Sequence, residues 1–286
     1  WVSNRVRQAY ADNPAIECES PPKTGISTGQ NGKYILRWHE VDFRLFGISQ
    51  ESRSSAYKYY PHNKGGDFRK WYGNQSDVLK YSSADIAEME TEDGFRHDNS
   101  KLYFLPSISW TKITSSYFNA RWYPKGFTFN SASVAIYPSR TLFMLGYLNS
   151  VVFAHLTKAV SQTLNFTVGE IAKLPVVNFV SQIQEEAVAE LLDISQKDWD
   201  SAETSWSFST FPLAAELKTK SLAESWISWN IDSEKNASRT KELEKINNQV
   251  FIDAYGLEYE LSPEIAENQI TLYRADREKD CQRLIS

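Results

Sequence analysis

The sequence is poor in residues that build disulfide and metal sites. It has two cysteines in 286 residues, Cys18 and Cys281, which lie near opposite ends of the chain. They form no CxxC pair, and the four histidines are scattered without the Cys/His spacing of a zinc site. The composition therefore excludes a disulfide framework. We expect a reduced, cytoplasmic protein without a metal.

Long apolar runs are also missing. No signal peptide opens the chain, and polar residues such as Asn149 and Lys158 interrupt the most apolar stretch, residues 142–160. We expect one long buried helix over 140–160 and no membrane partner. The chain starts without an initiator methionine, inside a helix predicted over 1–10, which favours a fragment of a longer protein.

The familiar catalytic motifs are absent. The sequence contains no GxSxG, GxxxxGK[ST], HExxH or GxGxxG. An amino-methyltransferase motif consists of a polar residue, Pro-Pro and an aromatic residue. The nearest match in this sequence is Ser20-Pro21-Pro22-Lys23. Lys23 stands where a target base needs a ring to stack on. We interpret the two prolines as a rigid linker and expect no catalytic residue and no cofactor site in this chain.

Charge is unevenly distributed. Residues 1–150 hold 18 Lys and Arg against 14 Asp and Glu, a net +4, whereas residues 151–286 hold 13 against 22, a net −9. Between 101 and 175 seven basic residues accompany the single acidic Glu170. This segment is suited to facing phosphates, although a solvated basic surface would have the same composition.

The hydrophobic pattern changes near Pro175. Before it, from residue 23 to 137, short apolar or aromatic runs alternate with Gly, Asn, Ser and Pro, which is typical of strands and loops. After it, apolar residues recur at helical spacing. We predict an α+β fold, with a mixed α/β domain over 1–175 and a helical domain over 176–286. The polar run 231–242 is predicted to be a loop.

Three segments differ from ordinary core. The first, residues 23–32, combines glycines with hydroxyl and amide groups, which suits close approach to phosphates or base edges but also a plain glycine turn. Its candidate DNA contacts are Lys23, Thr24, Gly25, Thr28, Gly29 and Asn31.

The second segment, residues 59–73, interleaves basic residues with aromatics around a double glycine. This mixture is typical of groups that meet a sugar-phosphate backbone. The alternative is that the aromatics are core and the charges are solvated. The candidate contacts are Lys64, Gly65, Gly66, Arg69 and Lys70.

The third segment, residues 109–126, carries hydroxyls, an amide and basic groups. Arginine pairs with guanine and asparagine with adenine in many complexes, so we expect phosphate or purine contacts here. The candidates are Ser115, Ser116, Asn119, Arg121 and Lys125, while Trp110, Phe118 and Trp122 are predicted to pack.

These segments in this order, followed by 146–150 and 164–175, resemble the C-terminal half of the PglX methyltransferases of BREX phage-defence systems. The similarity continues through 198–208 and 246–257, so it covers nearly the whole chain. Ala202 departs from the pattern, because an aromatic residue is expected there. That departure concerns packing more than DNA.

The resemblance implies a parent enzyme that transfers a methyl group from S-adenosylmethionine to adenine N6 in double-stranded DNA. Its catalytic domain would precede Trp1, and this chain would be the adenine-specific enzyme's target-recognition region. The implied partners are DNA, the methyltransferase domain of the same chain, and other defence-system proteins or phage DNA-mimic inhibitors. The region diverges between relatives, so the resemblance does not imply the target sequence.

Two other functions fit the same residues. One is the specificity subunit of a multi-subunit restriction-modification system, for which two recognition domains would be expected rather than one. The other is a protein-interaction module whose aromatics and acidic helices dock partners. The protein-interaction module predicts no salt-sensitive DNA binding.

Overall fold

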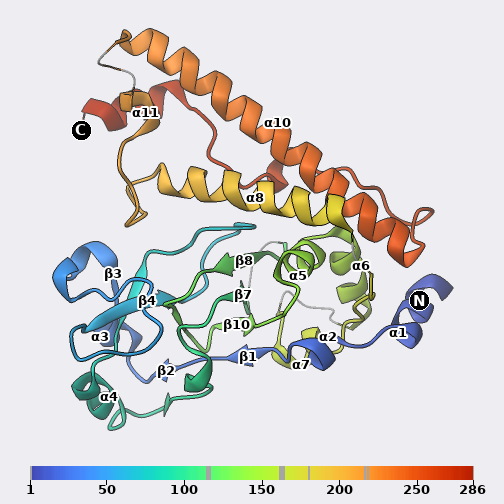
Figure 1. The fold of residues 1–286 in the computed structure, drawn as a ribbon, viewed down its shortest axis with the longest axis horizontal. Coiled ribbons are helices and arrows are strands. Elements are labelled where there is room, and N and C mark those ends of the chain that lie inside the picture. Colours follow the sequence, from blue (N-terminus) through green and yellow to red (C-terminus); the bar gives the residue numbers. More distant parts are fainter. Residues whose placement is uncertain are drawn as a thin grey trace.

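The computed structural model describes residues 2–113, 117–160, 165–179, 181–215, 217 and 219–285. A part rich in strands is covered along one side by two long helices, α8 (Gln182–Asp200) and α10 (Leu222–Tyr255) (Figure 1). This mixture of sheets and helices, with a helical C-terminal region, confirms the predicted α+β class. In the part of the chain that the structure describes, no helix has the length and apolar character needed to cross a membrane.

The chain begins with two helices that lead into the first sheet. Helix α1 (Asn4–Asp12) confirms the predicted N-terminal helix, and its Ser3 N-cap accepts a hydrogen bond from the Val6 amide. Helix α2 (Ile16–Glu19) follows, and Ile16 is fully buried. Val6 and Ile16 belong to the main hydrophobic core, so these helices are anchored to the rest of the fold.

The first sheet has the antiparallel strand order β1-β10-β7-β8. Its strands are β1 (Lys23–Thr24), β10 (Ser133–Ile136), β7 (Ser107–Thr111) and β8 (Ala120–Tyr123). All four residues of β10 are buried, which requires cover on both faces. Apolar side chains of β7 and β10 join the main core together with helices α5 (Thr141–Leu148) and α6 (Val151–Val160).

The second sheet has the order β3-β5-β4-β9 and is antiparallel except between β4 and β9. Its strands are β3 (Ile35–Arg37), β5 (Asp77–Lys80), β4 (Tyr59–Asn63) and β9 (Thr128–Phe129). A second core of mainly aromatic side chains, including Tyr34, Tyr60 and Tyr81, packs against it. Further short elements are α3 (Asn31–Tyr34), α4 (Ser83–Met89), α7 (Val168–Ala172) and the pair β2 (Ser27–Thr28) and β6 (Phe95–Arg96).

The predicted single helix over 140–160 is wrong, because it divides into α5 and α6 at Asn149 and Ser150. The Asn149 side chain accepts a hydrogen bond from the Ala120 amide at 2.9 Å and donates to the Ala120 carbonyl at 3.0 Å. Ser150 Oγ accepts from the Phe153 amide and so caps α6. Asn149 therefore binds the edge of β8, at the point where the helix is interrupted.

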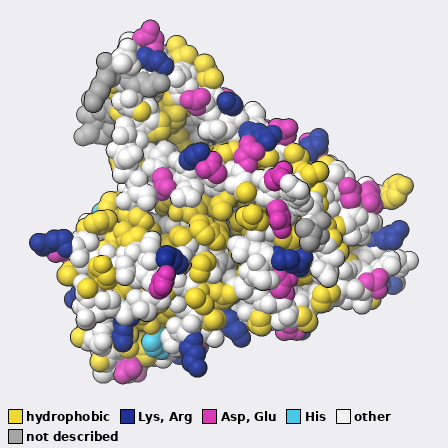
Figure 2. All heavy atoms as spheres, viewed as in Figure 1, with side chains coloured by type: hydrophobic (Ala, Val, Ile, Leu, Met, Phe, Trp, Pro, Cys, Tyr) yellow, Lys and Arg dark blue, Asp and Glu magenta, His cyan; other side chains and the backbone are white. Residues whose placement is uncertain are grey.

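The predicted loop over 231–242 is also wrong, because these residues lie inside the 34-residue helix α10. Their small side chains Ser233, Ala237 and Thr240 are buried along one face. On another face Arg239 binds both carboxylate oxygens of Glu190 in α8 at 2.7 Å. Figure 2 shows Lys and Arg intermixed with Asp and Glu over this helical part. A polar run thus forms a helix when it has one packed face and ion pairs on the others.

The main core continues across the predicted boundary at Pro175. Tyr147 of α5 stacks on Tyr255 of α10, with ring centroids 6.0 Å apart, and both hydroxyls donate to the Pro175 carbonyl. Burial raises the pKa of both phenols. The division into domains at 175 stays a prediction, and the two parts share one core.

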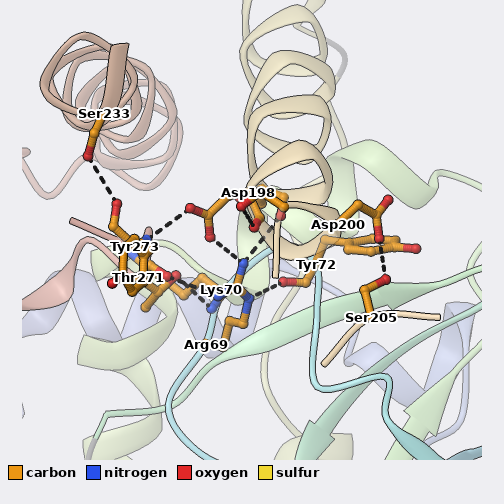
Figure 3. Close-up of polar contacts among 11 residues, drawn as sticks. Arg69, Lys70, Tyr72, Asp198, Asp200, Ser205, Ser233, Thr271 and Tyr273 are labelled. Carbon is orange, nitrogen blue, oxygen red and sulfur yellow. Dashed lines mark hydrogen bonds and ion pairs between the residues drawn. The ribbon is translucent and has the colours of Figure 1, made fainter. Parts of the chain in front are cut away.

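A polar contact joins the loop after β4 to the helical part, and we call its residues Arg69, Lys70, Asp198 and Glu244 the helix clamp. Figure 3 shows Arg69, Lys70 and Asp198 of this clamp. The Lys70 ammonium pairs with the Glu244 carboxylate of α10, and both residues are buried. Trp71 Nε1 donates to the same carboxylate at 2.8 Å. The clamp therefore neutralises both buried charges of this pair.

Arg69 supplies the second half of the clamp. Its Nη2 lies 2.7 Å from Asp198 Oδ2 of α8, and the guanidinium lies 5.1 Å from the Trp199 ring. It also donates to the carbonyls of Tyr72 and Thr271. The loop after β4 is thus bonded to α8, α10 and the segment before α11 (Arg277–Ile285).

The segment 198–208 makes the neighbouring aromatic contact. The Trp206 ring lies 5.4 Å from the Phe46 ring and 5.8 Å from the Phe127 ring. Trp38 Nε1 donates to the Thr204 carbonyl at 3.0 Å. The tryptophan-rich motif therefore attaches the helical part to the strands, and short α9 (Pro212–Ala215) follows it.

Replacing Gly146 by Ala is expected to destabilise the protein by about 1–3 kcal/mol, because an added methyl overpacks the core. A Cβ there would lie 2.0 Å from Gln184 Nε2 and 2.4 Å from Asn247 Oδ1. The matched control is Gly169→Ala in α7, where a Cβ meets nothing within 4 Å. This control should be neutral or stabilising by up to roughly 1 kcal/mol. Urea unfolding of both variants is the measurement, and equal midpoints would contradict the packing of α5.

Replacing Lys70 by Met is expected to cost about 3 kcal/mol or more, because it leaves the Glu244 charge buried without its partner. The double variant Lys70→Met with Glu244→Gln should be more stable than Lys70→Met alone, because Gln keeps an acceptor for Trp71 and removes the charge. Denaturant unfolding of both single variants and the double variant forms a complete cycle. Additive losses would show that the two groups do not interact.

Candidate nucleic-acid interface

One turn, residues 130–132, joins the three segments that the sequence singled out. The Asn130 carbonyl accepts from the Gly25 amide, and the Ser131 amide donates to the Ile26 carbonyl. The Asn130 amide donates to the Asn63 carbonyl, and the Lys112 amide donates to the Ala132 carbonyl. This turn was not among the predicted segments. Its signal was Asn130-Ser131-Ala132-Ser133 directly after an aromatic strand, a composition typical of turns.

Buried polar side chains form hydrogen bonds next to this turn. His62 Nδ1 lies 2.8 Å from Thr128 Oγ1, and His62 Nε2 lies 3.4 Å from Asn130 Nδ2. Burial, with a smaller effect of the Lys64 charge, lowers the pKa of His62 to about 3, so its ring is neutral. Asn63 Nδ2 donates to Ser109 Oγ at 2.6 Å. These bonds connect the end of β4 to both sheets.

The second and third segments contact each other next to these bonds. We define the loop surface as the residues Lys64, Gly66, Lys112, Ile113 and Tyr117. Thr111 Oγ1 donates to the Gly66 carbonyl at 3.0 Å, and the Phe68 and Tyr117 rings lie 5.8 Å apart. Ile113 is 69% exposed and Tyr117 is 51% exposed. Among the residues that the structure describes, neither Lys64 nor Lys112 pairs with a carboxylate. The loop surface thus combines free cations with exposed apolar groups.

Glycine is required where these loops touch. Gly65 and Gly66 have φ values of 98° and 122°, in the region that side chains disfavour. A Cβ on Gly65 would lie 3.1 Å from Thr111 Oγ1, and one on Gly66 would lie 2.8 Å from Asn74 Nδ2. Gly65 therefore lets the second segment approach the third, and contact of either glycine with DNA stays a prediction.

The structure places Asn119 and Arg121 inside the protein, and DNA contact by either stays a prediction. Both are buried, at 2% and 0% exposed, so neither reaches a base edge in this conformation. Arg121 donates through Nη1 to the Arg69 carbonyl and to Asn119 Oδ1, through Nη2 to Thr111 Oγ1, and through Nε to the Tyr123 hydroxyl. The guanidinium group of Arg121 therefore makes its hydrogen bonds inside the protein, and these bonds join the second and third segments.

Arg69 and Lys70 differ from the expectation in the same way. Their charged groups belong to the helix clamp, where they face Asp198 and Glu244 rather than solvent. The basic residues of this segment therefore differ in how deeply they are buried. Lys64 lies at the surface, whereas the cations beside Trp71 are paired inside.

The first segment is divided between two environments. Thr28 is fully buried and donates to Asn31 Oδ1 at 2.8 Å. Gly29 packs against Glu92, whose carboxylate binds Lys33 at 2.8 Å. This neighbourhood has acidic groups, which disfavours phosphate contacts by Thr28, Gly29 or Asn31.

The other end of the first segment is strand. Lys23 and Thr24 form β1, and a Cβ on Gly25 would lie 1.8 Å from the Phe129 carbonyl oxygen. Gly25 therefore serves a close backbone approach inside the fold, and its contact with DNA stays a prediction. Lys125 is exposed and pairs with Glu51 at 2.9 Å. Ser115 and Ser116 lie outside the described residues, and DNA contacts by Lys23, Thr24 and Lys125 stay predictions.

The Pro-Pro sequence lies between α2 and β1. Ser20 Oγ accepts from the Tyr137 amide at 2.7 Å, and Lys23 is paired with Ala135 of β10. These residues hold a sheet edge, and the absence of a catalytic or cofactor site in this chain stays a prediction. Within the described ranges, no group of three or more His, Cys, Asp and Glu side chains could hold a metal ion.

A solved structure shares the fold. It is the Type IIL restriction-modification enzyme MmeI, solved in complex with DNA, which matches with a TM-score of 0.50 and 12% sequence identity. The match covers 87% of this chain and 34% of the MmeI chain. At this identity the likeness concerns the fold alone.

Two curated proteins are similar in sequence, whereas no family model matches. The adenine-specific methyltransferase PglX of Lacticaseibacillus casei (strain Zhang) is 32% identical over an alignment of 281 residues that covers 92% of this chain and 23% of that protein. The adenine-specific methyltransferase BrxX of Escherichia coli O9:H4 (strain HS) is 28% identical over an alignment of 215 residues that covers 73% of this chain and 17% of that protein. The chain thus spans less than a quarter of the length of either relative. Its homologues are the PglX and BrxX adenine-specific methyltransferases, and it corresponds to a segment of them, as the resemblance in its sequence indicates.

Proposed function

We propose that this chain recognises a short sequence in double-stranded DNA for an N6-adenine methyltransferase of a BREX phage-defence system. The observation that carries the proposal is the loop surface, where Lys64 and Lys112 have no acidic partner among the described residues and lie beside exposed Ile113 and Tyr117. The names of the relatives support adenine as the base that the parent modifies. The DNA complex of MmeI supports DNA as the partner.

The chemistry of the loop surface suits a duplex. Lysine ammonium groups bind backbone phosphates and set the register of the protein on the DNA, whereas apolar and amide groups contact base edges. The exposed side chains of Ile113 and Tyr117 offer such apolar contacts, for example to a thymine methyl. A methyltransferase must extrude its target base, so a separate region that holds the flanking duplex is useful.

The helix clamp gives this reader a fixed position. It bonds the loop after β4, which carries Lys64 and Gly66 of the loop surface, to α8 and α10. In the proposed parent these helices would set the distance between the reader and the methyltransferase domain of the same chain. S-adenosylmethionine would supply the methyl group in that other domain, and we propose the cytoplasm, where phage DNA enters, as the location.

Replacing Lys64 or Lys112 by Ala in the parent enzyme should weaken binding to the methylation site and to a scrambled duplex alike. Each phosphate contact that a substitution removes should make the slope of log affinity against log salt shallower by about 0.9. The control is Lys197→Ala in α8, an exposed lysine that pairs with Asp193. Affinity measured over several salt concentrations checks this. Unchanged slopes in both variants would remove the loop surface from the DNA interface.

The 286-residue chain alone should transfer no methyl group and should bind S-adenosylmethionine poorly, because its Pro-Pro residues hold a sheet edge. Calorimetric titration with the cofactor is the measurement, with the parent enzyme as the positive control. A micromolar dissociation constant for the isolated chain would contradict the placement of methyl transfer in another domain.

A further inference from the structure

Three basic side chains lie inside the protein at the junction of the second and third segments, and only two of them have acidic partners among the described residues. Arg69 pairs with Asp198, and Lys70 pairs with Glu244. Arg121 is completely buried, and none of the residues that the structure describes gives it a carboxylate partner. The junction therefore carries one positive charge that the described residues leave unpaired.

The partners of Arg121 are all neutral. They are the Arg69 carbonyl, Asn119 Oδ1, Thr111 Oγ1 and the Tyr123 hydroxyl. These bonds satisfy the guanidinium geometrically but leave its charge, which arginine retains in proteins. Because a buried charge is costly without an opposite charge, this arrangement favours an anion from outside the chain.

The bonds of Arg121 also show which surface its charge supports. Its Nη2 donates to Thr111 Oγ1 at 3.2 Å, and Thr111 Oγ1 donates in turn to the Gly66 carbonyl at 3.0 Å. Gly66 is exposed on the loop surface beside Lys64. The guanidinium is thus linked through Thr111 to the exposed Gly66, and its charge acts across this short distance in a medium less polar than water.

We propose that Arg121 is a positioning residue for DNA: its unpaired charge attracts a backbone phosphate to the loop surface at Gly66 and Thr111, without direct contact. This inference rests on the proposed function and adds the group that sets the potential of that surface. Arg121 also holds the main chain of both loops through Thr111 and Arg69. The same side chain therefore fixes the shape and the charge of the phosphate site.

Asn119→Asp in the parent enzyme tests the charge directly. Asn119 Oδ1 already accepts from Arg121, so an aspartate of nearly the same shape would place a carboxylate on the guanidinium. Affinity for the target and for a scrambled duplex should fall alike, by about five- to ten-fold at low salt and less at high salt. The thermal midpoint should not fall with it, because the new carboxylate pairs with a buried cation.

Two controls separate charge from other effects. Asn236→Asp changes the net charge equally at an exposed position of α10 and should leave DNA affinity unchanged. Asn119→Ala and Asn119→Asp both remove the amide group that donates to the Tyr117 carbonyl. Only Asn119→Asp adds a negative charge, so Asn119→Ala should bind DNA more tightly than Asn119→Asp. In addition, Arg121→Lys should bind more tightly than Arg121→Met, because only Lys keeps the charge.

The outcomes are distinct. Wild-type affinity in Asn119→Asp, or equal losses in Asn119→Ala and Asn119→Asp, would overturn the role of the charge. A loss confined to the target duplex would make Asn119 a base reader and would also overturn it. If the wild-type parent bound neither duplex in a salt-sensitive way, the proposed function itself would fail, and the variants would not be needed to show it.

Discussion

The pairing of Lys70 with Glu244 is the constraint on which the arrangement of this protein depends. Two charged groups leave water together, and each requires the other because an unpaired buried charge is costly. The pair forms only when the loop after β4 lies against α10, so it specifies one relative position of strands and helices. Arg69, bound to Asp198 and lying over Trp199, adds a second directional contact to the same position.

The architecture was largely predictable from periodicity, and the errors arise from contacts between segments that are distant in the sequence. Apolar spacing indicated the N-terminal helix and the helical C-terminal part. The break at Asn149 could not be predicted, because it depends on the Ala120 main chain, 29 residues away. The helix through 231–242 was missed because its stability comes from Glu190 of another helix and from a face of small side chains. Both errors reflect tertiary contacts that override local composition.

The candidate site was predictable as segments but not as side chains. The order and composition of the three segments identified chain regions that the turn at 130–132 joins. Composition does not give depth, so Lys64 at the surface and Lys70 inside were indistinguishable in sequence. Arginine and asparagine are the residues most often paired with purines, yet here Arg121 and Asn119 bind each other beneath the surface.

Strand β8 lies at the edge of its sheet, and its outer hydrogen-bonding groups are occupied. The Asn149 amide takes both main-chain groups of Ala120, and the main chain of Trp71 bonds to Ala120 and Trp122. An edge closed in this way offers no template on which another chain could add a strand. The loops at its end can therefore change sequence without turning this edge of the sheet into a surface for aggregation.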